Sequence, residues 1–127
     1  MGIIEEKPRP KILIADDEDA LRLLAHETLE DEAADILEAC DGEEALEMAR
    51  QEHPRLILLD VAMPGLTGFE VCEILKSDPA TRDIIIVMLT AHGQSKDRER
   101  AELSGADHFM TKPFSPVRLL RLVAQIL

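Results

Sequence analysis

The sequence predicts an α/β protein built on one doubly wound, five-stranded parallel sheet. Short apolar runs alternate with helical patterns along the whole chain. This alternation is typical of strand–helix units whose strands pair in parallel and whose helices cover both faces of the sheet. Crossovers between parallel strands are right-handed, and five units fit the strand order 2-1-3-4-5. The 127 residues suit one domain with its own core.

The strands are expected at five apolar runs. The strongest is Leu56–Leu59, which ends in Asp60. Ile84–Leu89 is apolar throughout, as expected for a strand that is buried on both faces. The other three candidates are Lys11–Ala15, Ala34–Ala39 and Ala106–Met110.

Helices are expected in the intervals, over residues 21–29, 41–50, 66–76 and 94–103 and from residue 115 onward. Ser104-Gly105 is typical of a helix C-terminus. Ser115-Pro116 offers an N-cap and a proline at the first helical position. Residues 1–10 contain two prolines and are expected to be a leader to a single domain over residues 11–127.

Composition excludes several classes of function. The net charge of −12 argues against direct binding to nucleic acid, which needs clustered Lys and Arg. No apolar run approaches the roughly 20 residues needed to cross a bilayer, and the N-terminus is no signal peptide. Cys40 and Cys72 lack metal-binding spacing and are expected to be buried and reduced. We therefore expect a cytoplasmic protein.

The chemistry is expected at one edge of the sheet, because open parallel sheets bind ligands beyond the carboxyl ends of their strands. Asp16 and Asp17 follow the first strand, Asp60 ends the third, Thr90 ends the fourth and Lys112 follows the fifth. Clustered carboxylates repel one another unless a cation balances them, and oxygen ligands favour Mg²⁺. Lysine and a hydroxyl suit phosphoryl oxygens, and a carboxylate can act as the nucleophile in phosphoryl transfer.

Four motifs, in order, resemble the receiver domain of bacterial response regulators over about residues 11–127. ILIADDE is similar to the family's first strand with its acid pair, and LILLDVAMPGLTGFE to its phosphorylation segment. VMLTAHG supplies the Thr-Ala pair, and DHFMTKPF the Lys-Pro pair. The resemblance, which is to single-domain chemotaxis-type receivers, implies the flavodoxin-like (βα)5 receiver fold and a role in two-component signalling.

The resemblance implies a role for each matching residue. Asp60 accepts a phosphoryl group from the phosphohistidine of a histidine kinase or phosphotransfer protein. Asp16, Asp17, Asp60 and the backbone carbonyl of Ala62 hold Mg²⁺, for which Mn²⁺ can substitute. Thr90 and Lys112 contact the phosphoryl oxygens. Such a domain catalyses its own phosphorylation and dephosphorylation and is not a turnover enzyme.

Further positions are implied to couple this chemistry to a partner. Phe109 matches the aromatic switch position that works with Thr90, although it also fits a simple core residue. The Lys112-Pro113 bond is expected to be cis. The Gln94–Leu127 region would present the output face to an effector domain, another protein or a second copy of the chain. Its last helix is apolar over more than half its circumference, wider than packing on a sheet needs.

Two positions depart from common versions of the pattern, and two other functions remain open. Ala62 and His92 stand where the family tunes the lifetime of the aspartyl phosphate. One alternative is an aspartate-nucleophile, Mg²⁺-dependent phosphatase of the haloacid-dehalogenase type, although that family uses Asp-x-Asp after its first strand. The other is an interaction module that is never phosphorylated, against which the five chemical residues argue.

Overall fold

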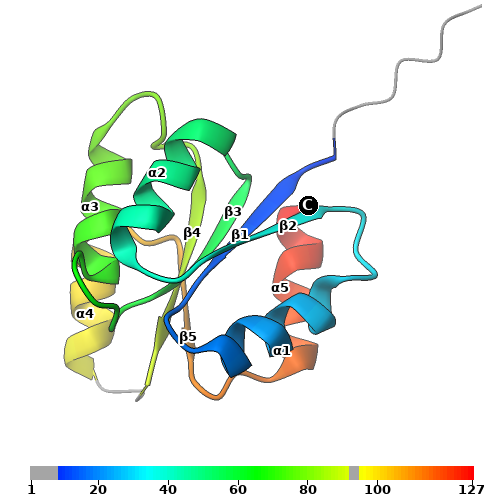
Figure 1. Ribbon diagram of the computed structural model, residues 1–127. Helices are drawn as coiled ribbons and strands as arrows, with labels where there is room; N and C mark the ends of the chain where they lie inside the picture. Colours follow the sequence, from blue (N-terminus) through cyan, green and yellow to red (C-terminus); the bar gives the residue numbers. More distant parts are fainter. Residues whose placement is uncertain (1–8, 92–94) are drawn as a thin grey trace, which may run out of the picture.

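Five parallel strands form a sheet between two layers of helices in the computed structural model, which describes residues 9–91 and 95–127 (Figure 1). The strand order is β2-β1-β3-β4-β5, so the predicted topology is confirmed. The elements in chain order are β1 Lys11–Ala15, α1 Asp19–Leu29, β2 Asp35–Ala39, α2 Gly42–Glu52, β3 Leu56–Asp60, α3 Gly68–Ser77, β4 Ile85–Thr90, α4 Ser95–Leu103, β5 His108–Thr111 and α5 Pro116–Ile126.

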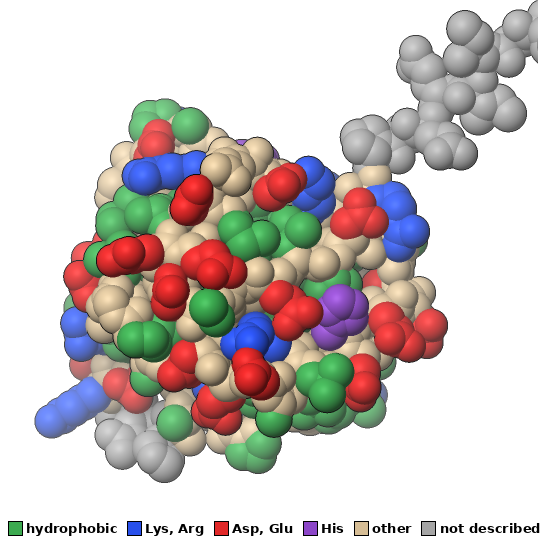
Figure 2. Space-filling model, in the orientation of Figure 1, with side chains coloured by type: hydrophobic (Ala, Val, Ile, Leu, Met, Phe, Trp, Pro, Cys, Tyr) green, Lys and Arg blue, Asp and Glu red, His purple; other side chains and the backbone are tan. Residues whose placement is uncertain are grey.

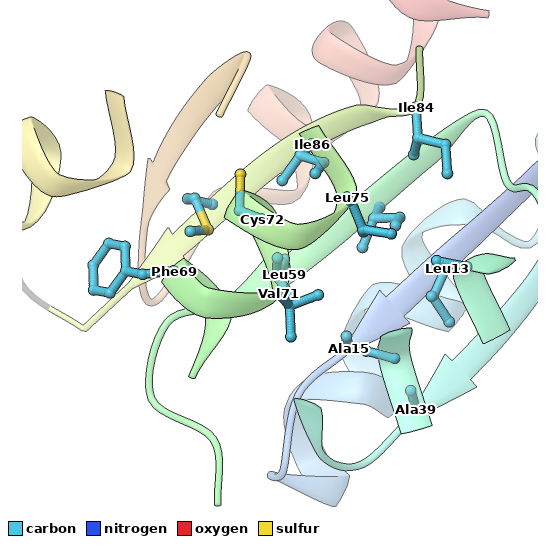
Figure 3. Packing of buried hydrophobic residues seen from close by; sticks show 14 of the residues in the cluster. Leu13, Ala15, Ala39, Leu59, Phe69, Val71, Cys72, Leu75, Ile84 and Ile86 are labelled. Carbon is cyan, nitrogen blue, oxygen red and sulfur yellow. The ribbon is translucent and has the colours of Figure 1, made fainter. Parts of the chain in front are cut away.

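Each face of the sheet has its own core. Helices α2, α3 and α4 cover one face, and α1 and α5 cover the other (Figure 1). Successive strand residues point to opposite faces, so Leu59 packs under α3 whereas Leu58 packs under α1 and α5. Figure 3 shows Cys72 and Leu75 of α3 lying over Ile86 of β4. Burial on both faces explains why the central strands are continuously apolar.

The start of α3 differs from the prediction and has a clear cause. The helix begins at Gly68, two residues later than the predicted Leu66. Thr67 is its N-cap, and its side chain accepts a hydrogen bond from the Glu70 N–H while the Glu70 carboxylate accepts one from the Thr67 N–H. This reciprocal capping box satisfies two N–H groups that a helix end leaves unpaired, which fixes the boundary.

The fifth strand also begins two residues later than predicted, at His108. Asp107 connects it to β4 instead, because its carboxylate accepts a hydrogen bond from the Ile86 N–H at 2.9 Å and lies 2.8 Å from the ammonium of Lys76. The predicted end of α4 is confirmed, with Gly105 at φ +96°. So is the start of α5, where the Ser115 side chain caps the helix and Pro116 is its first residue.

The prediction that both cysteines are buried is only half right. Cys72 of α3 is buried, but Cys40, which follows β2, is exposed, and its thiol donates to the Glu44 carboxylate of α2 at 3.4 Å. Of the expected leader, only Arg9 and Pro10 are described, and Arg9 donates a hydrogen bond to the Ala34 carbonyl at 3.0 Å. Within residues 9–91 and 95–127, no helix has the length and apolar character to cross a membrane.

Gly68 allows α3 to start directly against the end of β3. A Cβ at this position would lie 2.2 Å from the backbone oxygen of Asp60. Because that neighbour is backbone and cannot yield easily, we expect Gly68→Ala to lower the free energy of unfolding by about 3 kcal/mol. Urea denaturation monitored by circular dichroism measures the loss.

Gly65→Ala is the matched control for this substitution. Gly65 has a φ of +75°, but a Cβ there would approach only the Glu43 side chain, at 3.7 Å. Its cost is therefore backbone strain alone, about 1 kcal/mol. Equal losses in the two variants would show that close packing at Gly68 is not the constraint.

Candidate functional site

Three charged side chains meet at the carboxyl edge of the sheet because strand side chains alternate between the two faces. Asp16, Asp60 and Lys112 each lie two residues after a buried apolar residue of the core under α1 and α5. Side chains two apart share a face, so all three project on that side. Asp16 is fully buried, Asp60 is 2% exposed and the Lys112 side chain is 12% exposed.

The ammonium of Lys112 lies between the two buried carboxylates. Its Nζ atom is 2.9 Å from Asp16 Oδ2 and 3.2 Å from Asp60 Oδ1. A third acid, Glu18, lies 3.7 Å away but is exposed. One buried cation thus faces two buried anions, so this part of the protein carries a net negative charge that a further cation would balance.

Local charges shift the pKa of two of these groups. Burial, together with the negative charge of Asp16, raises the pKa of Asp60 from 3.8 to about 6, although Lys112 and the Ala62 N–H oppose the shift. Burial alone would lower the pKa of Lys112, but its bonds to Asp16 and Asp60 outweigh burial and raise the pKa above 10.5. Above about pH 6, Asp60 is therefore an anion beside a firmly protonated lysine.

The loop after β1 carries the acid pair and can hold a divalent cation. Carboxylate oxygens of Asp16, Asp17 and Glu18 come within 4.8 Å of one another. Asp16 Oδ1 accepts a hydrogen bond from the Glu18 N–H at 2.9 Å. Asp16 Oδ2 is buried, and the ammonium of Lys112, 2.9 Å away, is its polar neighbour among the described residues. An all-oxygen donor set that includes a buried carboxylate fits Mg²⁺.

The backbone that follows β3 is also held in place, next to Asp60. The Ala62 N–H donates to Asp60 Oδ1 at 3.3 Å, and the Val61 N–H donates to the Leu89 carbonyl of β4 at 3.0 Å. Gly68 closes the loop, because its N–H donates to the Val61 carbonyl at 3.1 Å. The Asp60 carboxylate is therefore oriented by the backbone around it as well as by Lys112.

Thr90 and Phe109 lie on the opposite face of the sheet, toward α4. Thr90 is fully buried, and the Lys112 N–H donates to its carbonyl at 2.6 Å. Phe109 pairs with Met88 across β4 and β5, so it shares a face with Thr90, two residues beyond Met88. The Phe109 ring is half-buried, with the Arg98 guanidinium 5.9 Å from its centre. His92 lies outside the described residues.

The prediction that Asp16, Asp60 and Lys112 lie at one edge of the sheet is confirmed, but the sequence did not reveal a residue that contacts them. Lys112-Pro113 is cis, as expected. Arg22 of α1, which was not singled out, donates a hydrogen bond to the Asp16 carbonyl at 2.6 Å. A lone arginine on an amphipathic helix gives no sequence signal for such a contact. Figure 2 shows acidic side chains spread over one face of the molecule, in keeping with the net charge of −12.

The raised pKa of Asp60 has a consequence for stability. The folded protein binds this proton more tightly than the unfolded chain does, so ionising Asp60 destabilises the fold between about pH 4 and pH 6 and remains unfavourable above that range. We expect Asp60→Asn to be more stable than the wild type near pH 7.5, on the order of 2 kcal/mol, with no advantage near pH 4. Urea denaturation in a chelator measures both, and equal stability near pH 7.5 would contradict the shift.

Comparisons with family models, with curated proteins and with solved structures all indicate the same family. The model for the "Response regulator receiver domain" matches residues 12–124. The chain is 42% identical over 118 residues to the DNA-binding dual master transcriptional regulator RpaA of Synechocystis, covering 93% of this chain and 49% of that protein. It is 43% identical over 116 residues to the response regulator PleD of Caulobacter vibrioides, covering 91% and 26%. The chain thus spans about half or less of the length of these relatives.

A solved structure with the same fold covers the chain almost completely. The chemotaxis response regulator CheY4 of Vibrio cholerae superposes with a TM-score of 0.86 at 31% identity, covering 94% of this chain and 100% of that one. The strand order, the motifs and the buried carboxylates of Asp16 and Asp60 beside Lys112 all agree with the family match. The chain belongs to the response regulator receiver domain family of two-component signalling proteins.

Proposed function

We propose that Asp60 is the phosphoacceptor of this receiver and that the acids beside it hold Mg²⁺. The observation that carries the proposal is the buried Asp60 carboxylate, 3.2 Å from Lys112 and next to the buried Asp16. A nucleophilic carboxylate has to be ionised, and a pKa of about 6 leaves Asp60 mostly ionised at neutral pH. Its raised basicity at that pH favours attack on phosphorus.

The transfer itself needs little from the protein beyond position and charge. An Asp60 oxygen forms a bond to the phosphorus of a phosphohistidine while the phosphorus–nitrogen bond breaks, and the imidazole leaves with the electron pair. Lys112 and the Thr90 hydroxyl would contact the phosphoryl oxygens. Asp16, Asp17, Asp60 and the Ala62 carbonyl would hold Mg²⁺, which supplies positive charge for those oxygens; Mn²⁺ has similar ligand preferences.

This chemistry makes the protein a switch that modifies itself and not a turnover enzyme. Phosphoryl oxygens that draw Lys112 and Thr90 would rearrange contacts on both faces of the sheet. Helix α4 is suited to respond: among its described side chains only Ala101 is buried, and Arg98 and Arg100 lie against the rings of Phe109 and Phe69. Few buried contacts mean that a small free energy can shift this helix. Ala62 and His92 remain the positions expected to set the phosphate lifetime.

The face formed by α4, β5 and α5 is the proposed output surface. A groove of about 590 Å³ runs between these elements, lined by Arg98, Phe109 and Leu122 among others. Leu103 of α4 is 86% exposed and Val117 of α5 is 55% exposed; each is next in sequence to a residue that lines the groove, Glu102 and Arg118. Large exposed apolar side chains on these two helices favour a protein partner. A histidine kinase or phosphotransfer protein would bind near Asp60, whereas an effector or second copy would bind here.

A cytoplasmic location is part of the proposal. Cys40 and Cys72 are both free, which fits the reducing cytoplasm. The relative RpaA is a DNA-binding transcriptional regulator by name. For this chain we propose no direct contact with nucleic acid, because acidic side chains dominate it.

Incubation with acetyl phosphate and Mg²⁺, followed by intact mass spectrometry, tests the phosphoacceptor. We expect one phosphate added per chain, because one nucleophilic carboxylate is activated. Asp60→Asn and a chelator should each abolish it. The matched control is Asp31→Asn, which changes an exposed acid two residues beyond the end of α1 and should be modified like the wild type. Undiminished uptake by Asp60→Asn would refute the assignment.

A turnover assay with p-nitrophenyl phosphate separates the switch from a phosphatase. A haloacid-dehalogenase-type enzyme would turn over a generic phosphate ester many times, whereas a receiver should take up one phosphoryl group and release it slowly. Continuous release of phosphate from p-nitrophenyl phosphate, lost in Asp60→Asn, would favour the enzyme. Absence of any modification, with Mg²⁺ bound, would favour the pure interaction module.

The output face gives a separate prediction. We expect beryllofluoride with Mg²⁺, which mimics an aspartyl phosphate, to increase self-association or capture of a partner through α5. Val117→Lys places a charge on that face and should weaken the association without changing phosphorylation of Asp60. Sedimentation velocity at high protein concentration measures it. A monomer in both states, with no effect of Val117→Lys on any bound partner, would contradict the assigned surface.

A further inference from the structure

One arginine of α1 joins three parts of the chain next to the acid pair. The Arg22 side chain is only 15% exposed. Its Nη1 donates to the Asp16 carbonyl at 2.6 Å, and its Nε faces Glu38 Oε1 of β2 at 3.3 Å. Its Nη2 pairs with the Asp19 carboxylate at the start of α1. A planar guanidinium suits such multiple contacts, because its donors have a fixed geometry.

The contact to Asp16 is one of two that fix that residue's backbone. The Asp16 N–H donates to the Ala39 carbonyl at the end of β2, at 3.1 Å, and the Asp16 carbonyl accepts from Arg22. The Asp16 carboxylate is held through Oδ1 by the Glu18 N–H and through Oδ2 by the ammonium of Lys112, 2.9 Å away. These contacts fix how the carboxylate turns, whereas the two backbone contacts fix where the residue lies.

The start of α1 makes this contact more important than usual. Glu18 is the N-cap of α1, and its side chain makes no capping hydrogen bond. Helices normally fix the entry of the chain with such a bond. Here the three residues between β1 and α1, which include the acid pair, are tied back to the helix by Arg22 instead. Within the described residues, the exposed Asp17 side chain is positioned only by the loop backbone that Arg22 holds.

We propose that Arg22 is a positioning residue for the metal site, which holds the loop of Asp16 and Asp17 in the geometry that binds Mg²⁺. The inference rests on the proposed magnesium role of those two acids. Arg22 acts through the Asp16 backbone and through Glu38 and needs no contact with the metal. Residues that orient metal ligands in this way typically change metal affinity by 10- to 100-fold when they are removed.

The sign of the effect separates positioning from charge. Arg22 is a cation near the acids, so by Coulomb's law alone its removal should strengthen the binding of Mg²⁺. Loss of positioning should weaken it. A weaker affinity in a variant that has lost this positive charge is therefore not an electrostatic effect of the charge itself.

Mg²⁺ affinity of the whole chain, measured by calorimetry and by amide chemical shifts, tests the proposal. The chain has no Trp or Tyr, so intrinsic fluorescence is a poor probe. We expect Arg22→Ala to bind Mg²⁺ roughly 10-fold more weakly than the wild type. The Mg²⁺ affinity of Arg22→Lys should lie between those of the wild type and Arg22→Ala. A lysine ammonium can keep the contact to the Asp16 carbonyl but cannot make all the contacts of the guanidinium. Arg50→Ala, which removes an exposed arginine from the last turn of α2, should bind like the wild type.

The outcomes distinguish the inference from the function on which it rests. If the wild type does not bind Mg²⁺, the proposed metal site is wrong and the inference falls with it. If the wild type binds and Arg22→Ala binds equally or more tightly, the inference is overturned while the metal site stands. Circular dichroism checks folding; if Arg22→Ala is unfolded, Arg22→Lys decides, and wild-type affinity in it overturns the inference.

Discussion

Two buried carboxylates share one lysine at the carboxyl edge of the sheet, and the properties of the site depend on that arrangement. Asp16 and Asp60 would repel each other strongly in a buried setting without a cation. Lys112 lies within 3.2 Å of both but leaves one negative charge uncompensated. Burial and, after it, the charge of Asp16 raise the pKa of Asp60, and the uncompensated charge favours a divalent cation at this edge.

The order of the strands in the sheet is enough to bring these residues together. In the order β2-β1-β3-β4-β5, β1 and β3 are neighbours, so residues at their carboxyl ends lie side by side. The chain leaves β1 toward one face and β3 toward the other, which opens the crevice where such sheets bind ligands. Apolar strands bury the backbone beneath the acids, and the N-termini of α1 and α3 begin immediately above them. The packed strands and helices therefore hold the two carboxylates close together in spite of their mutual repulsion.

The strand order and the site could be predicted because both follow from local patterns. Apolar runs mark buried strands, and polar residues at their ends meet at one edge, so Asp60 and Lys112 were placed together correctly. The start of α3 depends on a capping box, and the exposure of Cys40 depends on its place in the turn between β2 and α2; hydrophobic patterns report neither. Arg22 was missed because its acceptor is a backbone carbonyl that only the folded loop presents.

A double-mutant cycle between Asp60 and Lys112 tests the shared ion pair most directly. The four proteins are the wild type, Asp60→Asn, Lys112→Met and the double variant, unfolded with urea in a chelator near pH 7.5. If Lys112 balances the buried carboxylates, Lys112→Met should cost at least about 1 kcal/mol more in the wild type than in the Asp60→Asn background. Costs that agree within about 0.5 kcal/mol would mean that the two residues are independent and would contradict the account.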